Sequence, residues 1–273
     1  MVVKLLKKEK SFNMSRNRRG KKLTEEELQE IEKFVYKKNI EEEKFLSSMF
    51  VNYKCRTENQ GKLRESIRNN EITIVSGLPG TGKTYIACAE ALKLIKSRPK
   101  YKKILLIKSV TQLKGEELGY LPGDIQEKFD PYMGSFVDNF EKIIGESLTQ
   151  KLRDLGLINI QPLAFVRGRS IDNTVIIVDE AQNISLDNMR TLMTRIGDNS
   201  KMIILGDVKQ KDLRNKKDSS LEVIIDKFNN MDNFGCVELR DPEDVVRNPI
   251  IKIIEETFDG IENGKQKQVL LKG

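Results

Sequence analysis

Residues 72–84 read Ile-Thr-Ile-Val-Ser-Gly-Leu-Pro-Gly-Thr-Gly-Lys-Thr, a short apolar run followed at once by a glycine-rich loop. From Gly77 to Thr84 the loop fits the pattern GxxxxGK[ST] at every position. This pattern predicts a strand, a phosphate-binding loop and a helix that begins at Lys83. The glycines allow successive backbone N–H groups to face the phosphates, while Lys83 reaches the β and γ phosphates and the Thr84 hydroxyl ligates Mg²⁺. The stretch therefore predicts a site for a nucleoside triphosphate and Mg²⁺.

Short apolar runs alternate with helical patterns from residue 71 onward. Several runs are nearly continuous, as expected for the strands of a parallel sheet that is covered on both faces. The alternation predicts an α/β fold with a doubly wound parallel sheet, which binds ligands at the carboxyl ends of its strands. The predicted strands are residues 72–76, 103–108, 157–163, 175–178, 202–205 and 236–239, and the predicted helices are residues 83–97, 124–152, 186–196, 219–229 and 243–257.

The composition restricts the chemistry open to the 273 residues. The chain has no histidine, which excludes a Ser-His-Asp triad, a Cys-His pair and a histidine-ligated metal. Its three cysteines lie far apart, which argues against a disulfide framework or a zinc cluster and indicates a reducing compartment. No apolar run approaches the roughly 18 residues of a transmembrane helix, and the N-terminus lacks the apolar segment of a secretory signal. We expect a cytoplasmic protein whose chemistry depends on carboxylates, Lys, Arg, hydroxyls and bound metal.

The basic charge is concentrated at the N-terminus. Residues 1–22 carry nine Lys or Arg and one Glu, a net charge of +8, whereas the rest of the chain holds 39 basic and 40 acidic side chains. Such an arm either binds polyanions without sequence specificity or is a solvated tail. A capping box formed by Thr24 and Glu27, followed by apolar residues at helical spacing, predicts one or two helices over residues 24–50.

A second motif, Val-Ile-Ile-Val-Asp-Glu at residues 175–180, is an apolar run that ends in two acids. At the carboxyl end of a strand, Asp179 would hold Mg²⁺, usually through water, and Glu180 would orient and polarise the attacking water. A simple acidic turn is the alternative interpretation. Together with the glycine-rich loop, the motif favours a site that hydrolyses a nucleoside triphosphate.

Three further segments bear on the nucleotide. Gln210 closes Gly-Asp-Val-Lys-Gln at residues 206–210, after the next predicted strand, and is expected to detect the γ-phosphate. Gln60 lies 17 residues before Gly77, where a glutamine that pairs with adenine would favour ATP, the alternative being an ordinary surface side chain. Residues 215–218, Asn-Lys-Lys-Asp, match a guanine-reading motif but follow a polar, basic stretch, so we interpret them as a basic loop.

Taken together, these motifs resemble the PhoH-like ATPase family over about residues 54–257, three quarters of the chain. The matching segments are residues 59–60, 77–84, 118–124, 128, 130–132, 162–169, 179–183, 194–197, 206–207, 210 and 244–249. The resemblance implies a P-loop NTPase with a RecA-like core, similar to the first motor domain of superfamily 1 helicases. It further implies action on RNA and assembly into a ring, expected to be a hexamer, and the family is frequent in phages.

A chain with one motor domain leaves its ATP site without a facing wall. A neighbouring copy that lends an arginine solves this, so we predict a homo-oligomer. Arg247 resembles the cis arginine that contacts the γ-phosphate in superfamily 1. Arg167 and Arg169 are candidates for the trans arginine or for an RNA contact, and structural ion pairs are the alternative for all three.

The sequence departs from the family pattern at two positions. Lys108 stands where the family usually has an Arg-Pro pair, so a phosphate or polynucleotide contact there is expected to be weaker. Asn248 replaces a histidine that is common in the family.

The prediction as a whole is a Mg²⁺-dependent ATPase coupled to RNA or other single-stranded nucleic acid, without a membrane partner, in the host cytoplasm if the chain is phage-encoded. A P-loop kinase and an ATP-driven assembly switch are the alternatives. The expected divisions are a basic disordered tail (1–22), a helical extension (23–53), the RecA-like ATPase domain (54–257) and a C-terminal tail (258–273). The predicted cofactor-binding residues are Gln60, Gly77, Leu78, Pro79, Gly80, Thr81, Gly82, Lys83, Thr84 and Tyr85; the metal ligands are Thr84 and Asp179; and the catalytic residues are Lys83, Glu180, Gln210, Arg247, Arg167 and Arg169.

Overall fold

The computed structural model describes most of the chain and divides it into two compact units, Met1–Ser48 and Met49–Gly273. The described residues are 24–109, 125–166, 168, 170–210, 219–248, 250, 253–254, 257–258 and 260–261. Within the first unit they form one long helix, α2 (Glu25–Ser48), where the sequence predicts one or two. None of the helices in the described part is both long and apolar enough to span a membrane.

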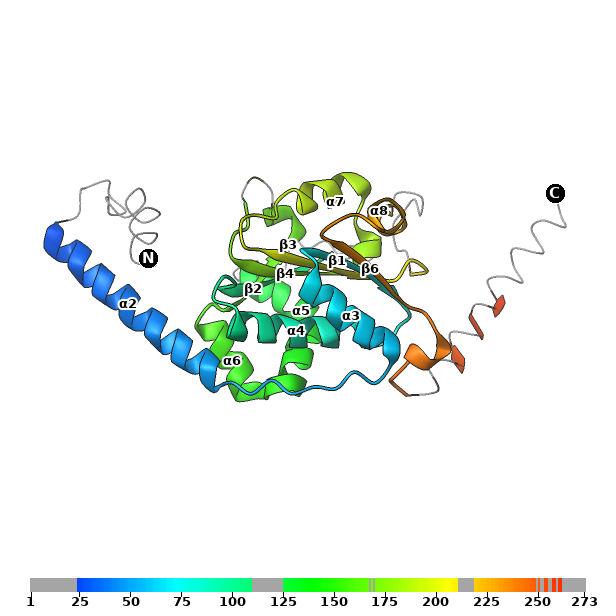
Figure 1. The fold of residues 1–273 in the computed structure, drawn as a ribbon, viewed down its shortest axis with the longest axis horizontal. Helices are drawn as coiled ribbons and strands as arrows, with labels where there is room; N and C mark the ends of the chain where they lie inside the picture. Colours follow the sequence, from blue (N-terminus) through cyan, green and yellow to red (C-terminus); the bar gives the residue numbers. More distant parts are fainter. Residues whose placement is uncertain are drawn as a thin grey trace. The chain divides into compact units, whose positions relative to one another are not determined.

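The second unit is built on a six-stranded sheet in the order β3-β2-β4-β5-β1-β6, and every pair of neighbours is parallel (Figure 1). The strands are β1 (Ile72–Gly77), β2 (Lys103–Lys108), β3 (Ile158–Pro162), β4 (Thr174–Asp179), β5 (Lys201–Gly206) and β6 (Phe234–Leu239). All six predicted strands are therefore present. In this order β5 lies between the strand of the glycine-rich loop and the strand of the two acids, an α/β arrangement of the RecA-like type.

Helices cover both faces of the sheet, with α3 (Glu58–Asn69), α4 (Lys83–Ser97), α5 (Ile125–Ile144) and α6 (Glu146–Asp154) on one side, and α7 (Leu186–Met193) and α8 (Ser220–Phe228) on the other (Figure 1). Alternate residues of β1, β2, β4 and β5 supply the core on the α7 and α8 side of the sheet. On β1, Ile72 and Ile74 pack with the α7 and α8 side chains Met189 and Leu221, whereas Val75 belongs to the buried residues outside that cluster. Strands β1, β4 and β5 are buried along their whole length, which explains their continuous apolar runs.

Two helix predictions are wrong in extent. The helix predicted over residues 124–152 is broken at Gly145, whose φ of 86° lies in a region that glycine tolerates and other residues avoid. The helix predicted from residue 243 begins later. A short 3₁₀ turn, Pro242–Asp244, is followed by extended backbone at Val245, and the Val246 N–H donates to the Gly80 carbonyl at 3.1 Å. This long-range bond to the glycine-rich loop overrides the local helical pattern.

Helix α3, which the sequence did not predict, is tied to α4 by an ion pair between a partly exposed arginine and a buried glutamate. Arg68 donates to both carboxylate oxygens of Glu90, at 2.8 and 3.0 Å, and the Tyr53 hydroxyl donates to the same carboxylate. Glu90 is only 1% exposed, so its charge needs these partners. The network fixes the segment before α3 against the helix that follows the glycine-rich loop.

Candidate nucleotide site

The glycine-rich loop joins β1 to α4 with backbone angles that suit glycine. Gly80 and Gly82 both have a φ of 77°, in the left-handed region, and Gly82 stands immediately before the first residue of α4. The Thr81 hydroxyl donates to the Leu78 carbonyl at 2.9 Å and closes the loop on itself. At Gly77 a Cβ would lie 2.8 Å from the Leu239 carbonyl oxygen, so only glycine fits beside β6. The predicted strand–loop–helix unit is present, and the start of α4 follows the loop directly, as in an anion-binding site at a helix N-terminus.

Lys83 begins α4, and its ammonium is held by the loop itself. Its Nζ donates to the carbonyl oxygens of Gly77 at 2.6 Å and Leu78 at 2.9 Å. Burial lowers the pKa of Lys83, and the negative charges of Asp207 and Asp179 act in the opposite direction. The Lys83 ammonium thus lies against the loop, within the electrostatic influence of Asp207 and Asp179, at the position expected for a contact with phosphate.

Asp179 and Glu180 follow the buried strand β4 as predicted. Asp179 is 8% exposed, and one of its carboxylate oxygens accepts the Glu180 N–H at 3.1 Å. Burial, together with the charge of Glu180, raises the pKa of Asp179 to about 6. Glu180 itself has a φ of 55°, a left-handed conformation that turns the chain sharply at the end of the strand. A buried carboxylate of this kind is stabilised when a cation binds beside it.

Gln182 connects this acidic turn to the end of the next strand. Its Nε2 donates to the Glu180 carboxylate at 2.7 Å, and its Oε1 accepts the Asp207 N–H at 3.1 Å. Gln182 is 1% exposed, so both ends of its amide are used inside the protein. At Gly206 a Cβ would lie 2.7 Å from the Gln182 Oε1 and 2.6 Å from the Leu221 Cδ2, which leaves room only for glycine.

Gln60, predicted to read adenine, supports the glycine-rich loop in this structure. Its Nε2 donates to the Thr81 carbonyl at 2.9 Å, and its Oε1 accepts the Arg56 N–H at 2.7 Å. It is 2% exposed and therefore not an ordinary surface glutamine. A primary amide has a second N–H and a second lone pair, so these bonds leave it one donor and one acceptor for a ligand.

The segment after β6 returns to the loop and brings Arg247 with it. Besides the bond from Val246 to Gly80, the Arg56 guanidinium donates to the Val246 carbonyl at 3.3 Å. Buried Asp244 accepts hydrogen bonds from the Thr57 hydroxyl and the Asn59 amide, both at 2.9 Å. A Cβ at Gly80 would lie 3.2 Å from the Cβ of Arg247, so this side chain packs directly over the loop.

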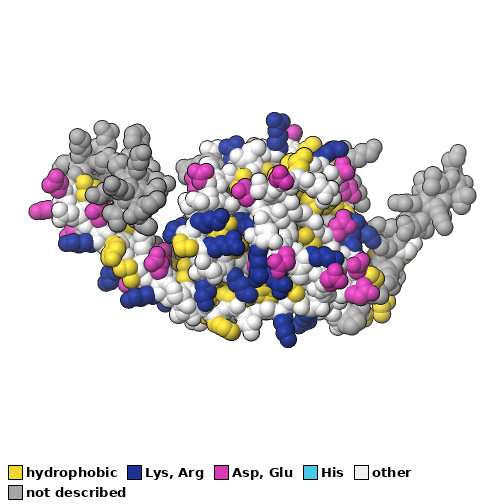
Figure 2. Space-filling model, in the orientation of Figure 1, with side chains coloured by type: hydrophobic (Ala, Val, Ile, Leu, Met, Phe, Trp, Pro, Cys, Tyr) yellow, Lys and Arg dark blue, Asp and Glu magenta, His cyan; other side chains and the backbone are white. Residues whose placement is uncertain are grey.

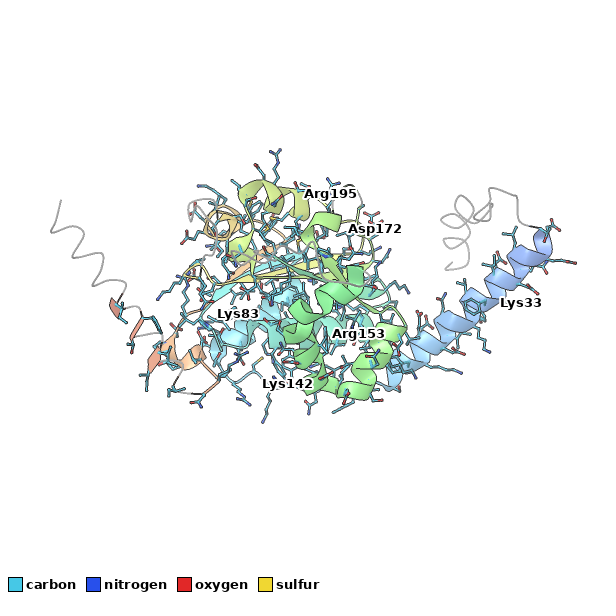
Figure 3. The ribbon with its side chains drawn as sticks, turned by 180° about the vertical axis from the view of Figure 1, so that it is seen from behind. Lys33, Lys83, Lys142, Arg153, Asp172 and Arg195 are labelled. Carbon is cyan, nitrogen blue, oxygen red and sulfur yellow. The ribbon has the colours of Figure 1, made fainter. Side chains whose placement is uncertain are left out.

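These elements line a partly open cavity of about 650 Å³ at the carboxyl edge of the sheet, a volume typical of small-molecule sites. Figure 3 labels Lys83 and Lys142, two of its basic side chains. Its lining comprises Lys54, Arg56, Gln60, Pro79, Gly80, Gly82, Lys83, Thr84, Tyr85, Lys108, Ser135, Asn139, Lys142, Asp179, Glu180, Gly206, Asp207, Gln210, Val246 and Arg247. Six of these side chains are basic and three are acidic, which favours a polyanionic ligand.

Most of the predicted site residues thus meet in one place. Arg167 and Arg169 lie outside the described residues. Sequence reasoning gave no role to Gln182 or Asp207, although both stand in the quoted motifs, and it did not single out the α5 residues Ser135, Asn139 and Lys142. The signal for Gln182 was its position two residues after Glu180, where a polar side chain follows a buried strand.

The oxygen ligands present fit Mg²⁺ only in combination with a nucleotide. In the described part of the chain, no group of three His, Cys, Asp or Glu side chains is arranged to hold a metal ion by itself. Thr84 and Asp179 supply a hydroxyl and a carboxylate at the cavity wall. Mg²⁺ is commonly bound by one or two such groups together with waters and substrate phosphates. The donor set therefore fits a cation that enters with the phosphates.

Comparison with known proteins agrees with this geometry. The family model for "PhoH-like protein" matches residues 52–259, which contain the loop, both acids and the returning segment. The chain belongs to the PhoH-like family. A PhoH-like protein of Bacillus subtilis is 39% identical over 206 residues, covering 76% of this chain and 64% of the relative. Protein PhoH of Escherichia coli K12 is 35% identical over 198 residues, covering 72% of this chain and 55% of the relative.

This PhoH-like chain spans less than two thirds of the length of those relatives. Among solved structures, the large terminase of a thermophilic bacteriophage is 9% identical with a TM-score of 0.44, covering 73% of this chain and 49% of the terminase. Domain III of DnaA from Thermotoga maritima is 13% identical with a TM-score of 0.32, covering 71% of this chain and 67% of that one.

The raised pKa of Asp179 predicts a pH-dependent stability in this PhoH-like chain. Ionised Asp179 opposes folding above pH 6, because raising its pKa from 3.8 to about 6 lowers the free energy of unfolding there by about 3 kcal/mol. As pH falls from about 6 toward 3.8, the folded state takes up the proton first and the cost disappears. Asp179→Asn, without nucleotide, is expected to raise the free energy of unfolding at pH 7.5 and to lose most of that advantage at pH 4.5. Urea denaturation of both proteins at the two pH values measures this, and an equal gain at both would contradict it.

Gly206 is predicted to be required beside Gln182. The methyl group of Gly206→Ala would overlap Gln182 and Leu221, and such overpacking lowers the free energy of unfolding by about 1–3 kcal/mol. The matched control is Gly61→Ala in helix α3, where a Cβ meets nothing within 4 Å. That change is expected to stabilise the chain by about 0.5–1 kcal/mol, since alanine favours helix. Thermal unfolding compares the two, and equal effects would show that the contacts around Gly206 are unimportant.

Proposed function

We propose that this chain is a Mg²⁺-dependent ATPase. The observation that carries the proposal is the meeting of Lys83, Asp179 and Glu180 in one cavity at the carboxyl ends of β1 and β4. Adjacent acids at the end of a buried strand, across from a glycine-rich loop, are the groups that hydrolysis of a phosphoanhydride requires. Membership of the PhoH-like family supports the same activity.

Each residue has a distinct part in this reaction. The N–H groups of the loop and the start of α4 bind the phosphates, and Lys83 exchanges its two carbonyl contacts for phosphate oxygens. Thr84 and Asp179 would hold the Mg²⁺, which, when bound, would supply positive charge that offsets the charge developing on the phosphates. Glu180 accepts a hydrogen bond from the attacking water and aligns it. Gln182 fixes the Glu180 carboxylate, so that the acid keeps its orientation between turnovers.

ATP is the nucleotide that the site favours. The remaining donor and acceptor of Gln60 match the edge of adenine, and Arg56 and Tyr85 line the cavity near it. The bond from Gln60 to Thr81 links this end of the cavity to the loop that binds the phosphates. Recognition of the base would in this way stabilise the conformation of the loop.

We further propose that hydrolysis is coupled to RNA or another single-stranded nucleic acid. Figure 2 shows Lys and Arg side chains gathered over α3 and α4 on the face in view. Several of these have structural roles, since Arg68 pairs with Glu90, Lys93 lies over the Tyr53 ring and Lys96 donates to the Met49 carbonyl. The proposal that hydrolysis is coupled to nucleic acid is therefore supported by membership of the family and by the basic side chains that line the cavity, and not by this surface.

Loss of the carboxylate that is proposed to align the attacking water is predicted to abolish ATP hydrolysis but to preserve the binding of Mg²⁺–ATP. Glu180→Gln should lower the ATP hydrolysis rate by about 10²–10⁴-fold, the usual contribution of a positioned base, with the affinity for Mg²⁺–ATP changed little. Phosphate release is measured with and without single-stranded RNA and DNA. Wild-type turnover that rises with one polymer and disappears in the variant is the expected result.

Glu238→Gln is the matched control, because Glu238 is exposed on β6 and lies outside the cavity lining. It should behave as wild type. Hydrolysis that continues in Glu180→Gln would overturn the assignment of the acid. Turnover indifferent to both polymers would end the proposed coupling and favour an ATP-driven assembly switch. Transfer of phosphate to an added acceptor would instead indicate a kinase.

The open wall of the cavity predicts self-association in the ATP state. Arg247 and Arg56 line the cavity, and a neighbouring copy that supplies a further arginine would complete the site, as in a closed ring. Glu180→Gln loaded with Mg²⁺–ATP is expected to sediment as a species heavier than one chain. Lys83→Ala, which should not retain ATP, is expected to sediment as a smaller species. A single-chain species for both variants would contradict the ring.

A further inference from the structure

Asp207 follows β5 and is held rigidly by its own turn. Its Oδ1 accepts the Lys209 N–H at 3.0 Å, its carbonyl accepts the Gln210 N–H at 3.2 Å, and its N–H donates to Gln182. The residue is 6% exposed. Three hydrogen bonds therefore fix both the backbone and the carboxylate of Asp207.

The second carboxylate oxygen of Asp207 has no such partner. Oδ2 is buried and lacks a hydrogen bond within the described part of the chain. Asp207 also lines the nucleotide cavity. A buried acceptor without a partner loses the free energy of hydration with no compensation, so each instance calls for a ligand, an ion or a water. Asp207 thus combines a buried carboxylate oxygen that has no partner with a place in the lining of the cavity proposed for the nucleotide.

The neighbouring charges indicate what this oxygen binds. Asp207 is the strongest of the negative charges acting on Lys83. The Lys83 ammonium is nevertheless bound to the Gly77 and Leu78 carbonyls, and among the described residues no ion pair joins it to Asp207. Asp179 and Glu180 line the same cavity, and their negative charges repel a second anion. The surroundings therefore favour a cation or the polarised water of one.

Direct coordination of a metal by the acids alone is excluded by their arrangement. Asp179, Glu180 and Asp207 all line the cavity, yet they do not form a group that holds a metal ion within the described part of the chain. Mg²⁺ keeps several of its waters when it binds with phosphates. These waters are strong donors, and carboxylates that accept from them strengthen the binding of the metal.

We propose that Asp207 is a third acid of the site and binds the water shell of the Mg²⁺ that accompanies the nucleotide. This rests on the proposed nucleotide site, and it adds a contact that neither Asp179 nor Thr84 provides. The bonds from Gln182 to Glu180 and to Asp207 then hold the acid that aligns water and the acid that orients the hydrated cation in one rigid unit.

Asp207→Asn tests the proposal, because the amide can keep the oxygen that Lys209 uses, while it removes the charge and replaces the other oxygen, an acceptor, with an NH₂ donor. The readout is the affinity for a fluorescent ADP analogue, measured with EDTA and across a Mg²⁺ titration. Without Mg²⁺ the variant should bind the analogue as wild type does, within about twofold. The Mg²⁺ concentration at half-maximal enhancement should rise by about 10–100-fold, the usual effect of losing an outer contact to a metal site. Asp226→Asn, on the exposed face of α8, is the matched control and should change neither value.

The melting temperature without nucleotide provides a second measurement. Asp207→Asn is expected to melt at the same temperature as wild type or higher, since it removes a buried charge that has a hydrogen bond from the Lys209 N–H but no ion pair among the described residues. If the variant does not fold, Asp207→Ser retains an acceptor for Lys209 and takes its place. An unchanged Mg²⁺ requirement, or a loss of affinity equal in EDTA and in Mg²⁺, would overturn the proposal and make Asp207 a structural residue of the turn.

The same data separate this inference from the proposed activity. Suppose that the wild-type chain binds the analogue with Mg²⁺ but does not hydrolyse ATP. This result would end the ATPase proposal, and the Mg²⁺ titration would still test the role of Asp207. A wild-type chain whose binding is independent of Mg²⁺ would overturn the proposal for Asp207.

Discussion

Parallel hydrogen bonding between β1, β5 and β4 is the constraint on which the rest of the structure depends. The register places Ser76 beside Gly206 and Val178 beside Ile204, so the three strands end at one edge of the sheet. The glycine-rich loop, the acidic turn at Asp179 and the turn at Asp207 begin at this edge. Residues separated by more than 100 positions in the chain come together because their strands are neighbours.

This edge concentrates charge against an apolar core, which would oppose folding without compensating bonds. Gln182 supplies two of them, to Glu180 and to the backbone of Asp207, and Lys83 is held by two carbonyls of the loop. The raised pKa of Asp179 shows that the compensation is incomplete. The positive charges of Lys108 and Lys83 offset only part of the cost of burying Asp179, so the site is expected to gain stability when a cation binds with its ligand.

The remaining wall of the cavity comes from parts of the chain that local patterns do not connect. Asp244 is bound by Thr57 and Asn59, and Val246 by Gly80 and Arg56, so the segment after β6, the start of α3 and the glycine-rich loop support one another. The sequence does not predict helix α3, because its mean hydropathy is low and only one side of it is buried. The returning segment was mistaken for helix because the bond that extends it joins residues far apart in sequence.

The sequence by itself determined the α/β class, the six strands, the phosphate-binding loop and the acids after β4. These follow from local rules: an apolar run predicts a buried strand, and a spaced set of glycines predicts a loop that accepts anions. Tertiary structure alone decided the order of the strands, the role of Gln60 as a support for Thr81, and the bridge that Gln182 makes between two strand ends. It also left the Asp207 carboxylate with one oxygen unused. The physical reason is that a hydrogen bond between distant residues depends on where both partners lie after the chain has folded, which no local pattern records.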